Sequence, residues 1–458
     1  MITINDKKIH LTPQQARNVI QDHTNRCGVF IDLDRVFDYR TGFIEKMKPL
    51  ERDIKSMSGN RNFKVTVPAD LVRALIDRFG VSEYSLKDRG GNVTASAPKR
   101  KELLEGGQLN QDAREFLTLF EELKKFQTLS STLATYANLP MLACESFENH
   151  RMVIAKPEWN VLNTGRIGAS NPAVQNLSKD LCDLVTYPKW LRMVRADSGQ
   201  IEPRITYSHY IPDPLLKELI IAYDDAYYGM LRFILMTDEE EIALRHKYNL
   251  FYKGCTAKDL EPNREIMLGI ELKIELAESA RSDLKVLLLA GNYGGDLSRF
   301  DPILANGFTR KIQNHPLRKQ WEYEVKEAVR DGQEVFYSYF GTPIRPGATA
   351  KYEVGGKGWR DHLVRCGINN PIQTTAADLM CESVYTVDKI IREKAVGDTT
   401  IGYYKHDEVL LYVDIRDGHL IPELASCTSY QVEDWITIGA DFLEGKKIGK
   451  NPYKISVA

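Results

Sequence analysis

The stretch TIGYYKHDEVLLYVD (400–414) decides the fold class of the central layer. β-Branched and aromatic residues flank the polar turn KHDE on both sides, a pattern typical of a β-hairpin. The segment LRMVRAD (191–197) is predicted to be a further strand that also ends in an acid. Asp407 and Asp197 have an ordinary interpretation as turn and cap residues. Alternatively, two carboxylates on adjacent strand ends suit a pair of Mg²⁺ ions about 3.5–4 Å apart. Spacing alone does not show that 197 and 407 meet.

Helical periodicity surrounds these strands. Apolar residues at helical spacing predict helix over residues 10–60, 68–79 and 111–128. Residues 151–213 have a strand-and-turn composition, 214–335 return to long helical segments, and helices and strands alternate from 336 to the end. The order helical, mixed, helical, mixed predicts an α+β fold in which a helical insert interrupts the mixed layer.

Composition excludes several classes of protein. The 458 residues include 61 Lys+Arg and 63 Asp+Glu, with 43% hydrophobic and 27% charged residues, as in an ordinary globular chain of two to four units. There is no apolar run of about 18 residues and no signal sequence, so we expect no membrane association and a cytoplasmic location. The 7 scattered cysteines form no zinc or disulfide pattern. A near-neutral charge is compatible with a local basic cleft for nucleic acid.

One predicted helix, residues 277–292, carries two cations on one face. Arg281 and Lys285 are four residues apart, which places them on the same side of the helix. Such a pair is usually part of a solvated surface. The functional interpretation is a triphosphate site, in which Arg supplies a planar fork and Lys a point charge. No Gly-rich Walker loop occurs in the sequence.

Five motifs in this order resemble the family A (DNA polymerase I-like) DNA polymerases. RADSGQIEPRI (195–205) resembles motif A, RSDLKVLLLAGNYGG (281–295) resembles motif B, and YKHDEVLLYV (404–413) resembles motif C. NTGRIGASNPAVQNL (163–177) and RCGINNPIQTTAADLM (365–380) resemble two further segments of the family. The resemblance extends over most of the chain, from about residue 15 to just beyond the hairpin.

The resemblance implies a right-hand polymerase fold with a helical thumb, an antiparallel-sheet palm and helical fingers. We expect an N-terminal segment and thumb in 1–150, the first part of the palm in 151–213, fingers in 214–335 and the second part of the palm in 336–458. The implied activity is that of a DNA-directed DNA polymerase. It adds deoxynucleotides to a primer 3′-hydroxyl by two-metal phosphoryl transfer and releases pyrophosphate.

The resemblance also implies roles for individual residues. Asp197 and Asp407 would bind two Mg²⁺ ions, with Mn²⁺ as a substitute, and Glu408 would be a more peripheral acid. The residues implied for catalysis on the nucleotide and for its binding are Lys285, Arg281, Leu289, Tyr293, Glu202 and Gln200, with Glu202 as the gate against a ribose 2′-hydroxyl. The residues implied for contact with primer–template DNA are Arg166, Asn176, Arg365, Asn369, Gln373 and His406.

The chain departs from the family pattern at several positions. Leu289 stands where the family usually has Phe or Tyr, Ala290 replaces the following Gly, and Pro203 replaces an apolar residue after Glu202. We expect these changes to bear on sugar discrimination and rate, and none of them replaces Asp197 or Asp407, the residues that the resemblance implies for metal binding. Tyr227 is the faint counterpart of a family His in the segment after motif A.

The expected partners are primer–template DNA and deoxynucleoside triphosphates. Because thumb-like sequence begins almost at once, we expect no proofreading exonuclease in this chain and a viral or mobile-element origin. A separately encoded exonuclease or processivity factor is then a further expected partner, in the cytoplasm of a bacterium or a virus-infected host cell. The alternatives are a catalytically impaired DNA-binding accessory subunit, a polymerase with relaxed sugar choice, and a single-subunit RNA polymerase. Glu202 and Glu408 argue against the last.

Overall fold

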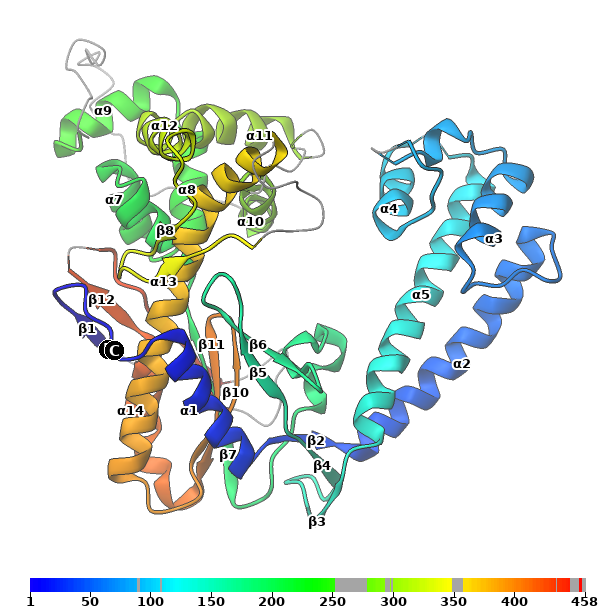
Figure 1. The fold of residues 1–458 in the computed structure, drawn as a ribbon, viewed down its shortest axis with the longest axis horizontal. Coiled ribbons are helices and arrows are strands. Elements are labelled where there is room, and N and C mark those ends of the chain that lie inside the picture. The colour runs from blue at the N-terminus through cyan, green and yellow to red at the C-terminus, as the bar shows by residue number, and fades with distance from the viewer. Residues whose placement is uncertain are drawn as a thin grey trace. The chain divides into compact units, whose positions relative to one another are not determined.

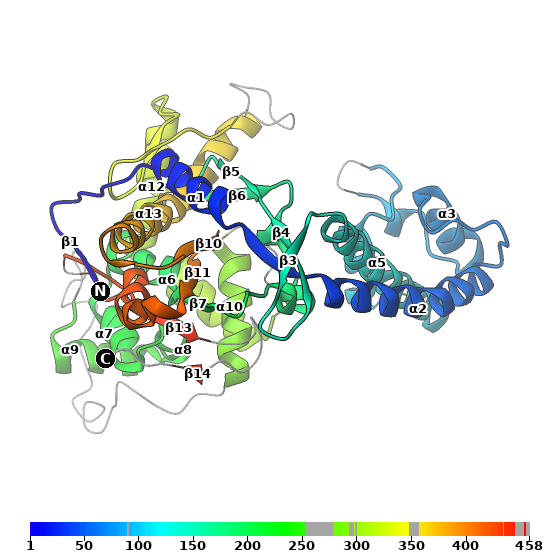
Figure 2. The same ribbon diagram turned by 90° about the horizontal axis from the view of Figure 1, so that it is seen from below.

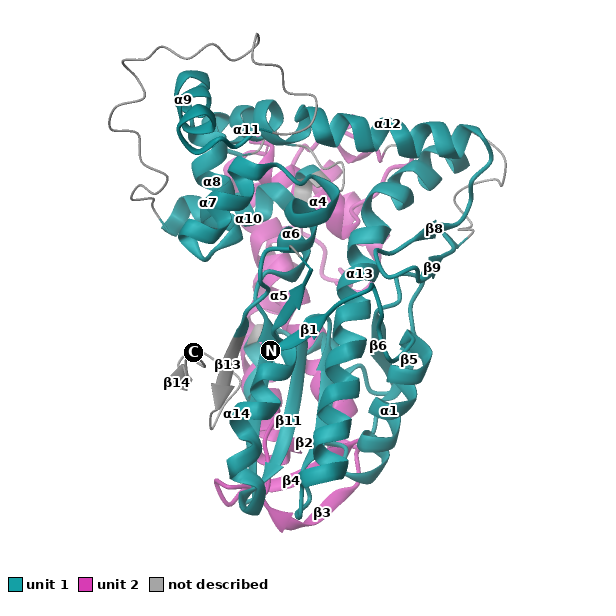
Figure 3. Ribbon diagram, turned by 90° about the vertical axis from the view of Figure 1, so that its left-hand side faces the viewer, with its two compact units in different colours: residues 1–29, 156–183, 189–458 teal, residues 30–155, 184–188 magenta. Residues whose placement is uncertain are grey.

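The computed structural model describes residues 1–88, 91–107, 109–251, 278–292, 297, 300–347, 357–433, 435–444 and 453–454. The chain divides into two compact units (Figure 3). Unit 1 comprises Met1–Val29, Lys156–Asp183 and Lys189–Ala458, and unit 2 comprises Phe30–Ala155 and Leu184–Pro188. Each unit buries a hydrophobic cluster of its own.

Two long helices, α2 (Leu33–Ser58) and α5 (Gln111–Ala137), lie side by side in unit 2 (Figure 1). The Asp32 side chain caps the start of α2 by accepting a hydrogen bond from the Arg35 amide, and α2 ends at Gly59 in the left-handed conformation. Their shared core includes Ile54 and Phe116. The connection between them contains α3 (Pro68–Arg73), the π-helix η1 (Ala74–Arg78), η2 (Tyr84–Leu86) and α4 (Ala97–Glu105).

A small sheet with the order β2–β4–β3 completes unit 2. Its strands are β2 (Val29–Asp32), β4 (Arg151–Ala155) and β3 (Met141–Glu145). The prediction of helix throughout residues 10–60 is therefore wrong at Val29–Asp32, which lies between α1 (Pro13–Arg26) and α2. The apolar residues of this segment pair with a strand more than a hundred residues later, which local periodicity does not detect.

The central sheet of unit 1 has the order β10–β11–β7–β13–β14, and every pairing is antiparallel. Its strands are β10 (Thr400–Lys405), β11 (Glu408–Asp414), β7 (Leu191–Ser198), β13 (Ala440–Glu444) and β14 (Tyr453–Lys454). All residues of β11 are buried, as expected for a strand with a neighbour on each side and helices nearby. The predicted hairpin at 400–414 and the predicted strand at 191–197 are both confirmed.

The longest helix, α13 (Lys357–Lys394), runs beside the central sheet and packs against α1 and α6 (Ile201–Ile205) (Figures 1 and 2). Helix α6 continues as the π-helix η5 (Thr206–Tyr210). Asp378, buried in α13, accepts hydrogen bonds from Ser338 and Thr342 at 2.5 and 2.8 Å. These bonds fasten the hairpin of β8 (Phe336–Tyr337) and β9 (Pro343–Ile344) to the helix.

A group of helices around an apolar cluster forms another part of unit 1. A Cβ atom at Gly229 would lie 2.7 Å from backbone atoms of Ile220, so only glycine allows α8 to approach α7 this closely. A buried network of Asp213, Arg245 and His315 joins three of the helices. The helices are α7 (Pro214–Tyr223), α8 (Ala226–Leu235), α9 (Asp238–Tyr248), α10 (Glu278–Asn292), α11 (Pro302–Phe308), η7 (Thr309–Gln313) and α12 (Pro316–Arg330).

Shorter elements complete the described chain. They are the parallel pair β1 (Ile2–Ile4) and β12 (Tyr430–Val432), the antiparallel pair β5 (Glu158–Val161) and β6 (Ile167–Ser170), and the short helices η3 (Val174–Asn176), η4 (Lys179–Leu184), η8 (Ile415–Leu420), α14 (Ile421–Ala425) and η9 (Ser426–Thr428). Among the described helices, none has the length and apolar character needed to cross a bilayer.

Candidate active site

The two aspartates singled out in the sequence lie on neighbouring segments of the central sheet. Asp197 is the penultimate residue of β7, and Asp407 lies in the tight turn between β10 and β11. The register pairs Asp197 with Glu408, the residue directly after Asp407. The amide of Ser198 donates a 2.8 Å hydrogen bond to the carbonyl of Asp407, which joins the two segments at this edge. Strand pairing thus brings together two acids that are 210 positions apart in the sequence.

The turn that carries Asp407 is also the place of His406. His406 has a positive φ of 53°, which tightens the reversal between β10 and β11. Partial withdrawal from water and the nearby Arg166 cation both lower the pKa of His406. The imidazole is therefore held in its neutral form at neutral pH, able to donate or accept a hydrogen bond.

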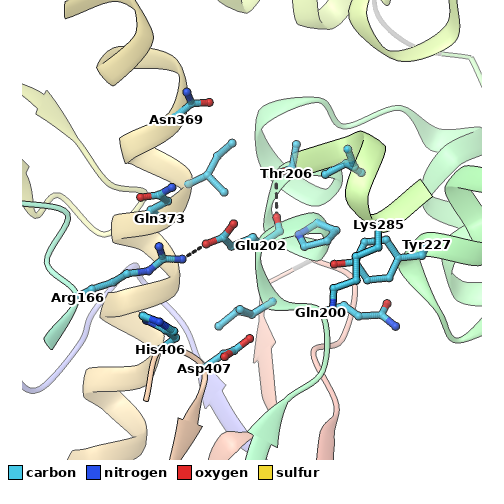
Figure 4. Close-up of a pocket in the computed structure, with 14 residues that line it drawn as sticks. Arg166, Gln200, Glu202, Thr206, Tyr227, Lys285, Asn369, Gln373, His406 and Asp407 are labelled. Carbon is cyan, nitrogen blue, oxygen red and sulfur yellow. Dashed lines mark hydrogen bonds and ion pairs between the residues drawn. The ribbon is translucent and has the colours of Figure 1, made fainter. Parts of the chain in front are cut away.

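We call the end of the sheet at which Asp197 and Asp407 lie the aspartate edge. A cavity of about 360 Å³ lies beside it and is lined in part by Asp407 (Figure 4). Figure 4 shows Asn369 and Gln373 projecting from α13 on one side, Tyr227 and Lys285 on the other, and Glu202 between them. Its size falls within the range typical of small-molecule sites. Its lining residues are Arg166, Gln200, Ile201, Glu202, Pro203, Thr206, Tyr227, Lys285, Leu288, Asn369, Ile372, Gln373, His406 and Asp407.

Glu202 lies near the start of α6 and faces Arg166, with which it forms an ion pair across the cavity (Figure 4). Gln200 adopts the left-handed conformation with φ 57°, which turns the chain sharply from β7 into α6. The hydroxyl of Thr206 donates a 2.8 Å hydrogen bond to the carbonyl of Glu202. This sharp turn places Glu202 in the cavity only five residues after Asp197.

Arg281 does not line the cavity, in contrast to Lys285 one turn later in α10. Its Nε and Nη2 atoms donate to one oxygen of Asp225 at 3.0 and 2.6 Å. The guanidinium also lies over the rings of Tyr227 and Tyr228, 5.2 and 5.5 Å from their centroids. Burial alone would raise the pKa of Asp225, but hydrogen bonds from Arg281 and the Tyr228 amide outweigh it and keep that pKa below its ordinary value.

Asp225 connects Arg281 to Gln200, which follows Asp197 by three residues. Its second role is to cap α8, since its carboxylate accepts a hydrogen bond from the Tyr228 amide at 2.8 Å. The side-chain amide of Gln200 donates to the same carboxylate at 2.6 Å and accepts from the Ala226 amide at 2.5 Å. Asp225 was absent from the predicted site residues, although it lies in DDAYYG (224–229), the segment in which Tyr227 was matched to a family His. Its position at the start of a helix was the signal available.

Lys285 extends over the same aromatic wall. Its ammonium lies 5.8 Å from the centroid of Tyr227, and the side chain is exposed. The next turn contributes Leu288, which is buried and lines the cavity. Leu289 belongs to α10, but its side chain lies outside the described part of the chain, as does the whole of Tyr293.

The remaining predicted DNA contacts separate into two groups. Asn369 and Gln373 follow each other by one helical turn of α13 and both line the cavity. Arg365, one turn before them, is exposed and lies outside the lining. Asn176, at the end of η3, is also exposed and outside the lining.

Unit 2 contains a separate group with metal-ligand spacing. Ligand atoms of Asp32, Glu148 and His150 all lie within 4.8 Å of one another. Arg35 pairs with both carboxylates, at 3.6 and 2.5 Å, and His150 Nδ1 lies 2.7 Å from Asp32. The hydrogen bond with Asp32 raises the pKa of His150. Because a guanidinium already neutralises these acids, we interpret the group as an ion network that fixes the start of α2.

Comparisons with known proteins show which proteins this chain resembles. No family model matches the chain. DNA polymerase I of Aquifex aeolicus (strain VF5) is 22% identical over 277 residues, which are 58% of this chain and 41% of that protein. DNA polymerase I of Pseudomonas aeruginosa is 22% identical over 433 residues, which are 90% of this chain and 40% of that protein. This chain therefore spans about two fifths of the length of these curated relatives.

A solved structure gives the fold. The POL domain of Pol1 from M. smegmatis, in complex with DNA primer–template and dNTP, superimposes with a TM-score of 0.69 over 95% of this chain and 70% of that chain, at 17% identity. The chain has the fold of a DNA polymerase POL domain. The predicted α+β polymerase fold is thereby confirmed. The division of this POL-type fold into thumb, palm and fingers at the residue limits given above stays a prediction.

Proposed function

We propose that this chain is a template-directed DNA polymerase that extends a primer 3′-hydroxyl with deoxynucleotides. The observation that carries the proposal is the placement of Asp197 and Asp407 on hydrogen-bonded segments at the edge of a cavity with Lys285 on its wall. The similarity to two DNA polymerases I and to a POL domain supports it.

The aspartate edge fits divalent metal ions. Asp197 and Asp407 are partly exposed, come from adjacent segments of a rigid sheet and offer the hard oxygen ligands that Mg²⁺ and Mn²⁺ prefer. Both residues would hold the ions. When bound, two such ions supply charge stabilisation to the attacking and the leaving oxygen.

The other side chains then bind and orient the substrates. Lys285 and Arg281 hold the triphosphate, so that the 3′-oxygen bonds to the α-phosphorus, its proton passes to water, and pyrophosphate leaves. Glu202 lies under the sugar and excludes a 2′-hydroxyl. Asn369 and Gln373 contact the minor groove of the primer–template duplex, where acceptors are nearly alike for all base pairs.

Arg166 and His406 complete the proposed primer-terminus contacts, and Gln200 the nucleotide contacts. Leu289, Tyr293, Arg365 and Asn176 keep their predicted roles as proposals from the sequence. Four further predictions from the sequence also stay proposals: the absence of exonuclease activity from this chain, its viral or mobile-element origin, its separately encoded partners and its cytoplasmic location.

Primer extension on a recessed DNA duplex with Mg²⁺ tests the proposal, with deoxynucleotides and ribonucleotides in parallel reactions. The wild-type chain should extend with deoxynucleotides alone. Asp407→Asn should abolish extension while duplex binding is retained, and Asp331→Asn, an exposed aspartate after α12, should match wild type. Duplex binding without extension by either nucleotide set would instead support the accessory-subunit interpretation.

The same assay tests the sugar gate. Glu202→Ala should admit ribonucleotides far more readily than wild type, because the carboxylate under the sugar is removed. Arg166→Ala removes the ion-pair partner of Glu202 and should slow extension without an equal change in sugar choice. An unchanged deoxy-to-ribo ratio in Glu202→Ala would remove Glu202 from the gate role. Extension of wild type with ribonucleotides would support relaxed sugar choice.

A further inference from the structure

A third carboxylate, Glu408, lies directly across the sheet from Asp197. The register of β11 against β7 pairs these two residues, so their side chains leave the sheet on the same face. Side chains directly opposite each other have Cβ atoms about 4.5–5.5 Å apart, and like charges in such a pair repel. Glu408 is nevertheless buried, with 6% exposure. Its charge therefore needs a compensating partner within the sheet.

Arg195 provides that partner. It lies two residues before Asp197 on β7, hence on the same face, and diagonally across from Glu408. Its Nε atom donates to Glu408 Oε1 at 2.6 Å and its Nη2 atom donates to Glu408 Oε2. The Tyr403 hydroxyl adds a 3.4 Å hydrogen bond to Oε1. Both carboxylate oxygens of Glu408 therefore already accept hydrogen bonds from within the sheet.

The same arginine lies on the strand face of one proposed metal ligand, Asp197, two residues later on β7. An arginine fork on a carboxylate is the strongest of the common ion-pair geometries, because two parallel bonds fix both groups. Glu408 is therefore held in one orientation rather than being available to a neighbouring ion.

We propose that Arg195 is a positioning residue that withholds Glu408 from the metal ions and thereby sets the charge of the aspartate edge. The inference rests on the proposed function of Asp197 and Asp407. Asp197, Asp407, Glu408 and Arg195 together, three acids and one cation, carry a net charge of about −2 at neutral pH. Asp441, which the register of β13 pairs with Asp197, is present in every variant compared. Loss of the Arg195 charge makes the edge more acidic and frees Glu408, whereas loss of the Glu408 charge frees Arg195 to pair with Asp197.

The test is the affinity for Mn²⁺ of the protein without DNA or nucleotide, because this affinity depends on the charge of the aspartate edge. The protein is titrated with Mn²⁺ alone, and binding is followed by calorimetry or by the electron paramagnetic resonance of free Mn²⁺. Arg195→Met should bind Mn²⁺ on the order of tenfold more tightly than wild type, and Glu408→Gln on the order of tenfold more weakly. The double variant has the wild-type net charge and should return to within about threefold of wild type. Arg192→Met, on the opposite face of β7, should leave Mn²⁺ affinity unchanged.

Opposite shifts in the two single variants, cancelled in the double variant, support the proposal. A purely structural pair would lower affinity in both single variants, and this result would overturn it. Single variants with wild-type affinity would also overturn it. If Asp407→Asn leaves Mn²⁺ affinity equal to that of wild type, the metal site of the proposed function has itself failed. Thermal melting of each variant identifies any variant that does not fold. If one single variant fails to fold, the other single variant and the double variant still show whether Mn²⁺ affinity rises or falls as the charge changes.

Discussion

Replacement of the buried Asp378 by Asn should remove a pH dependence from the stability of unit 1. Burial raises the pKa of Asp378 from its ordinary value of 3.8 to about 6, although hydrogen bonds from Ser338 and Thr342 partly oppose this rise. A carboxyl group whose pKa is raised in the folded state contributes stability below its unfolded pKa, and this contribution is lost as the pH rises through about 6. The full contribution is ~3 kcal/mol. Between pH 5 and pH 8 the wild type should lose ~1.4 kcal/mol that Asp378→Asn does not lose.

Tryptophan fluorescence during urea unfolding at pH 5 and pH 8 measures this difference. The probe is specific because all tryptophans of the chain belong to unit 1, namely Trp159, Trp190, Trp321, Trp359 and Trp435. Asp361→Asn is a matched control, since Asp361 is an exposed aspartate on the same helix and should follow wild type. Equal pH slopes for wild type and Asp378→Asn would refute the assignment of a raised pKa to this carboxyl group.

Two further predictions concern ion pairs among the helices of unit 1. Asp225→Asn weakens the ion pair that orients Arg281 and should raise the KM for deoxynucleotides about tenfold in steady-state kinetics, with kcat changed much less. The control is Asp224→Asn, because the Asp224 side chain is 97% exposed. An unchanged KM in Asp225→Asn would show that Asp225 does not act through Arg281. Arg245→Met leaves the buried carboxylate of Asp213 without its main cation and should lower the free energy of unfolding by about 3–5 kcal/mol, measured by the same tryptophan fluorescence. A loss below about 1 kcal/mol would mean that the pair contributes no more than a surface ion pair.

The sequence predicted the parts of the fold whose pattern is local. β-Branched and aromatic residues around a polar turn predicted the β10–β11 hairpin, the segment LRMVRAD predicted β7, and helical spacing predicted α10. The same spacing failed at Val29–Asp32, where four buried residues form a strand. Four residues are too few for periodicity to separate strand from helix. The deciding interaction is with β4, which local patterns do not contain.

The candidate site likewise has a part that the sequence predicted and a part that it did not. Sequence reasoning found the acids, but only the register of β7 against β11 shows that Asp197 and the turn of Asp407 are neighbours. The ion-pair partners were not predicted, because a side chain's choice among many charged groups depends on tertiary contacts. Of these partners, Arg195 was the easier to predict from the sequence, since its separation of two residues from Asp197 already placed it on the same face of a strand. Asp225 had no comparable relation to Arg281, 56 residues later.

The pattern of these pairs indicates how the cavity tolerates its charges before a substrate binds. Arg166 is paired with Glu202, and Arg281 with Asp225, whereas among the described residues Lys285 has an aromatic neighbour and no carboxylate partner. Arg281 uses Nε and Nη2 for Asp225, so this pair does not use its Nη1 donors. In the proposed function, Arg281 would bind a phosphate oxygen through Nη1 and keep its bonds to Asp225. Arg166 binds Glu202 in the cavity itself. Under the proposed roles, contact of Arg166 with a primer terminus and placement of a sugar over Glu202 would each compete with this ion pair. Substrate binding at Glu202 would then exchange one partner for another, whereas triphosphate binding at Arg281 would add a contact and break none.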